Sequence, residues 1–111
     1  MLMKSKIELL GMLGLAARAR LLVIGESACL RAVRNGQVKL VFLASDAGAN
    51  GAKKILDKCA FYKVPVFQSM SKDELSRAIG KDNRAVVGII SEQFAKKLAQ
   101  LTVLKDGGEG V

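Results

Sequence analysis

A short turn between an apolar run and a helical segment carries the groups best suited to bind an anion. Residues 25–28 read Gly-Glu-Ser-Ala and follow the apolar run 21–24. We expect them to open a helix, whose first backbone amides have no partner inside the helix. Arg31 and Arg34 lie one and two turns further on, and Lys39 follows the next turn. Free amides beside cations favour phosphate or the polar edge of a base, whereas a solvated helix face is the alternative for the two arginines.

A second glycine-containing turn, residues 48–54, also follows an apolar run and opens a helical segment. Its sequence is Gly-Ala-Asn-Gly-Ala-Lys-Lys. A phosphate-binding P-loop needs four residues between its glycines and a Ser or Thr after its lysine. Here two residues separate the glycines, and Lys54 follows Lys53. We therefore interpret this segment as a surface turn that leads into a basic first helical turn.

Asp46 follows the apolar run 38–44, where the phosphoacceptor of a receiver-like domain would stand. That chemistry needs further carboxylates at the end of the first strand to hold Mg²⁺ and a lysine at the end of a late strand. Glu26 is the one carboxylate at the first place, and the late run ends in Ser91 and Glu92. A receiver-like or small phosphate- or nucleotide-binding domain centred on Asp46 stays open as the alternative function, beside a turn residue that accepts backbone amides.

Histidine is absent, and the two cysteines, Cys29 and Cys59, form no CxxC pair. This excludes catalysis by a histidine base and leaves no pattern for a zinc site or a redox-active disulfide. Both cysteines are interpreted as small buried apolar residues. We predict no catalytic residue, no metal and no cofactor.

Alternating apolar and amphipathic segments must position these groups. Four runs of strand length are nearly continuous in apolar residues, as expected of strands covered on both faces: 21–24, 38–44, 64–68 and 85–90. Between them, helical spacing is carried by Ile7, Leu10, Leu13 and Ala17, by Cys29, Ala32 and Val33, by Ala52, Ile55, Leu56 and Cys59, and by Phe94, Ala95, Leu98 and Leu101. Ser71, with Glu74 three residues on, and Ser91 are the expected caps of the last two helices. The pattern predicts an α/β fold, a three-layer α/β/α sandwich with a four-stranded mixed or mostly parallel sheet.

The chain of 111 residues has the length and composition of one domain. We expect that domain to span residues 1–104 and a glycine-rich, flexible C-terminal tail to span residues 105–111. The apolar stretch 9–17 is interrupted by two glycines and is far shorter than the ~20 residues that span a bilayer. No membrane association is predicted, and the expected location is the cytoplasm.

The charge of the chain indicates a polyanionic partner. Lys and Arg number 18 against 10 Asp and Glu, a formal net charge of +8. Residues 1–39 alone hold seven basic residues and two acidic ones. A positive surface potential favours nucleic acid over an acidic protein, with a basic surface kept for solubility as the alternative.

The order of the motifs points to a family. Motifs at residues 25–32, 35–47, 59–66 and 71–80 follow one another in an order similar to that of the kink-turn RNA-binding ribosomal-protein family. That family includes the archaeal large-subunit kink-turn protein and the eukaryotic small nucleolar RNP core proteins. Residues 14–19 and 94–98 resemble in particular its small bacterial YlxQ-like members.

This resemblance implies a non-enzymatic, ribosomal-protein-like RNA-binding protein that recognises a kink-turn or a related sharply bent RNA. Such a bend crowds phosphates, whose repulsion bound cations offset, and opens a groove that can admit a helix N-terminus. The implied partners are structured RNA, including ribosomal RNA, and ribonucleoprotein components, with the protein itself a monomer. The residues that the resemblance and the charge pattern assign to RNA binding are Gly25, Glu26, Ser27, Ala28, Arg31, Arg34, Lys39, Asp46, Phe67, Gln68, Ser69, Met70 and Ser71.

Positions within this set differ from the family's usual pattern. Ser27 stands where the family usually has an Asn that reads a guanine, and Ala28 stands where many members have Glu or Gln. Arg31 stands where the family has Lys, and residues 67–71 stand where a loop would cover bulged nucleotides. Losing a bidentate base contact costs roughly 1–3 kcal/mol of discrimination. The resemblance therefore leaves both the standard kink-turn and a variant motif open as targets.

Overall fold

The computed structural model describes the backbone of residues 2–110 and the side chains of residues 6–102. Helices and strands alternate along the chain, and each strand lies inside one of the four predicted apolar runs. The elements are α1 (Leu2–Arg18), β1 (Leu22–Ile24), α2 (Glu26–Arg34), β2 (Leu40–Leu43), α3 (Ala49–Tyr62), β3 (Val66–Phe67), α4 (Lys72–Ile79), β4 (Val86–Ile89) and α5 (Glu92–Gly110). None of the helices in the described part of the chain combines the length and apolar character needed to cross a membrane.

The four strands form one mixed sheet in the order β1-β4-β2-β3. β4 pairs antiparallel with both β1 and β2, whereas β2 and β3 are parallel. The chain therefore leaves β1, β2 and β3 at one edge of the sheet and enters β4 at that same edge. We call this edge, where Gly25, Ala44, Gln68 and Ala85 lie, the carboxyl edge.

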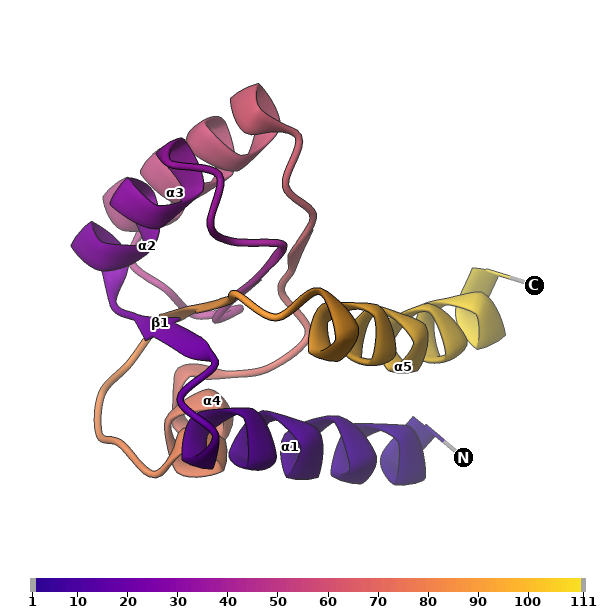
Figure 1. The fold of residues 1–111 in the computed structure, drawn as a ribbon. Coiled ribbons are helices and arrows are strands. Elements are labelled where there is room, and N and C mark those ends of the chain that lie inside the picture. The colour runs from indigo at the N-terminus through magenta and orange to yellow at the C-terminus, as the bar shows by residue number, and fades with distance from the viewer. Residues whose placement is uncertain (1, 111) are drawn as a thin grey trace.

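Helices cover both faces of the sheet, which confirms the predicted α/β sandwich (Figure 1). α2 and α3 pack on one face, and α1, α4 and α5 on the other. Successive residues of β2 point to opposite faces. Leu40 and Phe42 join the core beneath α1, α4 and α5, while Val41 and Leu43 join the core beneath α2 and α3. The mostly apolar sequence of this central strand follows from burial on both of its sides.

One residue of the predicted face of α1 is not buried. Leu13 is buried, and Leu10 and Ala17 pack against the core, as predicted, whereas Ile7 is 63% exposed and Leu9 and Ala16 are buried instead. The predicted face assumed that Ile7 points to the core, but the helix packs between α4 and α5 on an adjacent stripe. An ion pair from Lys6 to Glu74 at 2.6 Å fastens α1 to α4 and, with the Ser71 amide, holds the pKa of Glu74 below its ordinary value.

α5 begins as predicted and continues further than predicted. The Ser91 hydroxyl accepts a hydrogen bond from the Phe94 amide at 3.2 Å, which is the expected N-terminal cap. The backbone of residues 105–110 continues this helix, where the sequence predicts a tail. Val111 and the side chains of residues 103–110 lie outside the described part of the chain.

Candidate nucleic-acid interface

The entrance to α2 presents free backbone amides at the carboxyl edge. Gly25 precedes the helix with φ 101° and ψ 158°, a backbone conformation that is essentially restricted to glycine. No side chain of the described residues caps this helix, so the amides of residues 26–28 keep no partner within it. Glu26 and Ser27 are exposed and Ala28 is half-buried. The strand-to-helix turn therefore offers hydrogen-bond donors to an anion, as the sequence predicts.

A basic stripe continues from this entrance along α2. Ser27, Arg31 and Arg34 stand at positions i, i+4 and i+7, which places them on one face of the helix. All three are exposed, and no acidic group of residues 6–102 lies within ion-pair distance of either arginine. Arg34 lies about 10 Å from Ser27 along the helix axis. Arg31 is thus the nearer of the two cations to the free amides.

Lys39 is not brought to this entrance. Its amide donates to the Ile89 carbonyl at the end of β4, while the Gly25 amide donates to the Val86 carbonyl at the start of the same strand. The three residue steps from Val86 to Ile89 along β4 separate these two points by about 10 Å. Lys39 therefore lies at the opposite edge of the sheet from Gly25, because the α2 segment returns the chain to that edge before β2 begins.

The predicted covering loop, residues 67–71, reaches the carboxyl edge at a different place. The Met70 carbonyl accepts a hydrogen bond from the Ser45 amide, so this loop lies beside the end of β2. In the sheet, β4 and β2 lie between the loop and the end of β1. Met70 is only 2% exposed, and the Phe67 ring is half-buried, 6.1 Å from the Phe42 ring. Their apolar side chains face the core, which leaves Gln68 as the exposed side chain between them.

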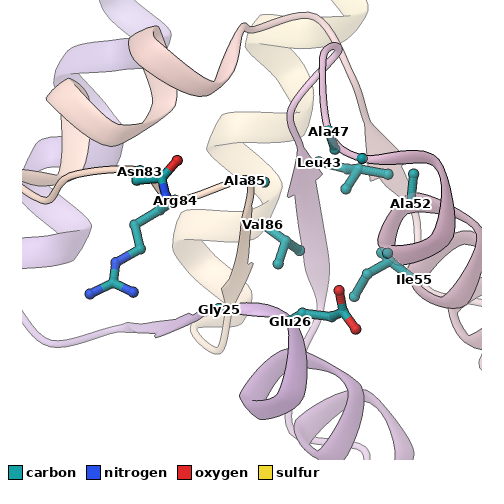
Figure 2. Close-up of a pocket in the computed structure, with 12 residues that line it drawn as sticks. Gly25, Glu26, Leu43, Ala47, Ala52, Ile55, Asn83, Arg84, Ala85 and Val86 are labelled. Carbon is teal, nitrogen blue, oxygen red and sulfur yellow. The ribbon is translucent and has the colours of Figure 1, made fainter.

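Residues 80–85, the α4–β4 loop, occupy the place beside the α2 entrance. The loop leads into β4, whose Val86 accepts the hydrogen bond from Gly25 at 3.0 Å. Together the two segments and the start of α3 enclose an open hollow of about 310 Å³. Figure 2 shows Arg84 projecting on one side of this hollow and Glu26 on the other, with Ala52 and Ile55 of α3 beside Glu26. The exposed Asn83 and Arg84 side chains join the candidate interface, although the sequence assigns them no role.

Glu26 is turned toward α3. Its carboxylate lies 3.9 Å from the Lys54 ammonium, and the absence of a side chain at Gly51 leaves room for it. A carboxylate in the first turn of a helix is favoured by the helix dipole. Lys54, from the basic turn at residues 48–54, is thereby paired with a residue that lines the hollow.

A buried hydroxyl holds the backbone of Arg84. The Ser76 Oγ donates to the Arg84 carbonyl at 3.1 Å and accepts from the Arg84 amide at 2.8 Å. Ser76 is 5% exposed, so this pair of bonds fixes the loop against α4 from the inside. The side chain of Arg84 is thereby aimed outward from an anchored main chain.

We expect Ser76→Ala to loosen this loop. Loss of two hydrogen bonds lowers the free energy of unfolding by about 1–2 kcal/mol and speeds hydrogen exchange at the Arg84 amide. Denaturant titration and exchange detected by NMR measure the two effects. Ser91→Ala removes another hydroxyl that accepts from a backbone amide, on α5, and should leave Arg84 exchange unchanged. Slow exchange at Arg84 in Ser76→Ala would contradict the anchoring role.

Asp46 and Ser71 serve the N-terminus of α4. The Asp46 carboxylate accepts from the Lys72 amide at 2.7 Å. Ser71 and Glu74 form the reciprocal capping box predicted for this helix. Asp46 is thus a turn residue that accepts a backbone amide, which is the structural role that the sequence leaves open for it.

Both cysteines are buried, as predicted. Cys29 and Cys59 lie in the core between α2, α3 and the sheet. Burial raises the pKa of Cys29 to about 12 and that of Cys59 to about 11. Neither thiol forms a thiolate near neutral pH, so neither is a nucleophile under those conditions.

The sequence matches the model of one protein family over residues 8–99, described as the ribosomal protein L7Ae/L30e/S12e/Gadd45 family. The chain belongs to this family. It is similar to RNA-binding protein YlxQ of Bacillus subtilis (strain 168), with 46% identity over 97 residues that cover 87% of this chain and 97% of the relative. It is also similar to RNA-binding protein YlxQ of Enterococcus faecium, with 42% identity over 92 residues that cover 83% of this chain and 88% of the relative.

Two solved structures share the L7Ae-family fold. A protein of unknown function from Bacillus halodurans C superposes with a TM-score of 0.81 at 52% identity, covering 84% of this chain and 94% of that one. The Giardia lamblia 15.5kD RNA binding protein superposes with a TM-score of 0.74 at 23% identity, covering 94% of this chain and 89% of that one. These structures confirm the α/β fold, and the match to the family model confirms the family predicted from the order of the motifs. They give no support to the receiver-like alternative centred on Asp46.

Proposed function

We propose that this protein binds a kink-turn or a related sharply bent RNA through the entrance to α2 and catalyses no reaction. The observation that carries the proposal is the set of free amides at residues 26–28, flanked by the exposed cations Arg31 and Arg84. Membership of a ribosomal-protein family and similarity to proteins named as RNA-binding support RNA as the polyanion. The net charge of +8 supports the same partner class.

Each part of the interface would have its own task in binding the RNA. Arg31 and Arg84 lower the repulsion between phosphates that a tight bend brings together. The amides of α2 and the Ser27 hydroxyl donate to phosphates or base edges in a groove that the kink has opened. The hollow, with Leu43, Ile55 and Val86 on its wall, takes an unstacked nucleotide. Arg34 lies further along the same stripe and adds long-range attraction to the flanking helix.

The residues at the entrance define which bent RNA is preferred. Ser27 has one short hydroxyl, and Ala28 has no polar atom in its side chain, so neither makes a bidentate contact to a base. Recognition therefore depends more on backbone amides and on the shape of the kink than on the identity of one base. We propose a bent motif whose central base pairs vary more than those of the standard kink-turn.

The family, the charge and the buried cysteines support a proposal for where the protein acts and on which RNA. We propose that the protein acts as a monomer in the cytoplasm on ribosomal or other structured RNA, within a ribonucleoprotein. Free, buried thiols at Cys29 and Cys59 are typical of a reducing compartment. Cross-linking in cells followed by sequencing of the bound RNA identifies the target. Recovery of ribosomal fragments would identify ribosomal RNA as the target, enrichment of another structured RNA would identify that RNA, and the absence of any enriched structured RNA would contradict the proposal.

A comparison of two RNAs of equal length tests the proposed function. A stem that contains a kink-turn is titrated with the protein in a gel shift beside a straight duplex, at low and at raised salt. We expect tighter binding of the kinked RNA and a strong salt dependence for both. Equal affinity for the two RNAs would contradict recognition of the bend. The absence of binding at low salt would contradict RNA binding altogether.

A further inference from the structure

Two adjacent aromatic side chains at the end of α3 face solvent. Phe61 is 77% exposed and Tyr62 is 39% exposed, with ring centroids 4.9 Å apart in an edge-to-face arrangement. The other phenylalanines, Phe42, Phe67 and Phe94, pack in or against the core. Exposure of a large apolar ring is unfavourable in water, so a pair of such rings indicates a binding surface.

This aromatic pair stands in a basic groove. Leu30 of α2 and residues 54–62 of α3 line a groove of about 560 Å³ around the rings, with Lys54 and Lys58 among them. Lys54, Lys58 and Phe61 stand at positions i, i+4 and i+7, so they form one stripe along α3. The one carboxylate in the groove, Asp57, is bonded to Lys53 at 2.7 Å. The charge of the groove therefore suits an anion.

The stripe begins at the candidate interface. Lys54 lies 3.9 Å from Glu26, which lines the hollow at the α2 entrance. From Lys54 to Phe61 the stripe extends about 10 Å along the helix axis. A strand that leaves RNA bound at the hollow can therefore reach the aromatic rings within a few nucleotides. Continuity with the interface and the positive charge favour RNA as the occupant over a protein.

We infer that Phe61 and Tyr62 form a stacking platform for an unpaired nucleotide in the strand that flanks the bent RNA, with Lys54 and Lys58 contacting its phosphates. The inference rests on the proposed function, because the bent element delivers the strand to the groove. Exposed aromatic rings bind bases of any sequence through their π faces, and nearby cations bind the backbone. The platform adds affinity for RNA with single-stranded flanks and does not read the kink itself.

The test compares a blunt-ended kink-turn stem with the same stem carrying about six unpaired adenosines on one end or the other. We expect the wild-type protein to bind one of the extended RNAs on the order of tenfold more tightly than the blunt one. Phe61→Ala should abolish this gain and leave affinity for the blunt stem unchanged, and Phe61→Trp should keep the gain. Because Phe61 is exposed, its truncation should leave the fold intact.

Ile7→Ala is the matched control, since Ile7 is an exposed apolar residue on α1, across the sheet. It should change neither affinity. Equal binding of blunt and extended RNAs by the wild type, as a protein-binding or self-associating face would give, overturns the platform. Equal weakening of both by Phe61→Ala also overturns it. If no kinked RNA binds, the proposed function fails separately. Titration with an isolated adenosine oligonucleotide then tests the stacking platform by itself. Binding of the oligonucleotide that Phe61→Ala removes supports the platform, and the absence of binding overturns it.

Discussion

Arg31→Glu is expected to lower the affinity for kinked RNA about 30-fold. Arg31 is exposed, lies one turn beyond Ser27 on the same face of α2, and has no acidic partner among residues 6–102. A pair of unit charges about 4 Å apart in water interacts by ~1 kcal/mol, so exchanging attraction for repulsion costs about 2 kcal/mol. The slope of the logarithm of the affinity against the logarithm of the salt concentration should also become shallower, by the equivalent of between one and two phosphate contacts. Titrations at several salt concentrations measure both effects.

The matched control is Lys97→Glu, on α5 at the other face of the sheet. It changes the net charge by the same amount at an exposed helical position. If net charge alone attracts the RNA, the two variants will lose affinity equally, and the placement of the interface at α2 will be wrong. Circular dichroism and denaturant titration should find both variants as stable as the wild type within about 0.5 kcal/mol, because each side chain is on the surface.

Gly25→Ala is expected to have an effect of similar size, because it changes both the backbone and the interface. At φ 101° and ψ 158°, the backbone of a residue that carries a Cβ is strained by about 1–3 kcal/mol. The added Cβ would meet no atom within 4 Å, so the cost comes from the backbone conformation and not from crowding. Relief of this strain rotates the first turn of α2 and turns its amides away from the RNA. Loss of one charge-assisted hydrogen bond, ~1.5–3 kcal/mol, weakens binding by roughly 10- to 100-fold beyond any loss of folded protein.

Gly36→Ala separates these two effects. Gly36 also has a positive φ, +75°, and a Cβ there would also meet no atom within 4 Å, but it lies just beyond the far end of α2. We expect it to lower the free energy of unfolding by about 1–2 kcal/mol without changing the RNA affinity of the folded protein. Thermal unfolding and binding at a temperature where each variant is folded are the measurements. A similar loss of affinity in both variants would assign the effect to stability.

The fold was predictable from the sequence to the level of its layers. The apolar runs located every strand because each is covered on both faces, and the capping residues located the starts of α4 and α5. The face of α1 was not predictable in the same way. Its apolar residues occupy more than one stripe, and the burial of Leu9 in place of Ile7 depends on how α4 and α5 pack against it.

The candidate interface was only partly predictable, for a topological reason. Strand order is set by long-range pairing, and nothing local in the sequence states that β4 inserts between β1 and β2. That insertion brings Asn83 and Arg84 beside Gly25 and leaves residues 67–71 on the far side of β2. The run of polar and charged residues at 81–84, directly before a buried strand, was the available signal. Lys39 was grouped with α2 because it is close in sequence, although a short helix and a turn carry it to the opposite edge.

The most direct test of the account is a map of amide chemical shifts in the protein as kinked RNA is added. We predict the largest changes at the amides of residues 25–28 and 83–85, with smaller ones along α2 to Arg34 and little change in α1 and α5. Changes centred on the edge that holds Lys39, or on the α1 and α5 face, would contradict the placement of the RNA at the entrance to α2.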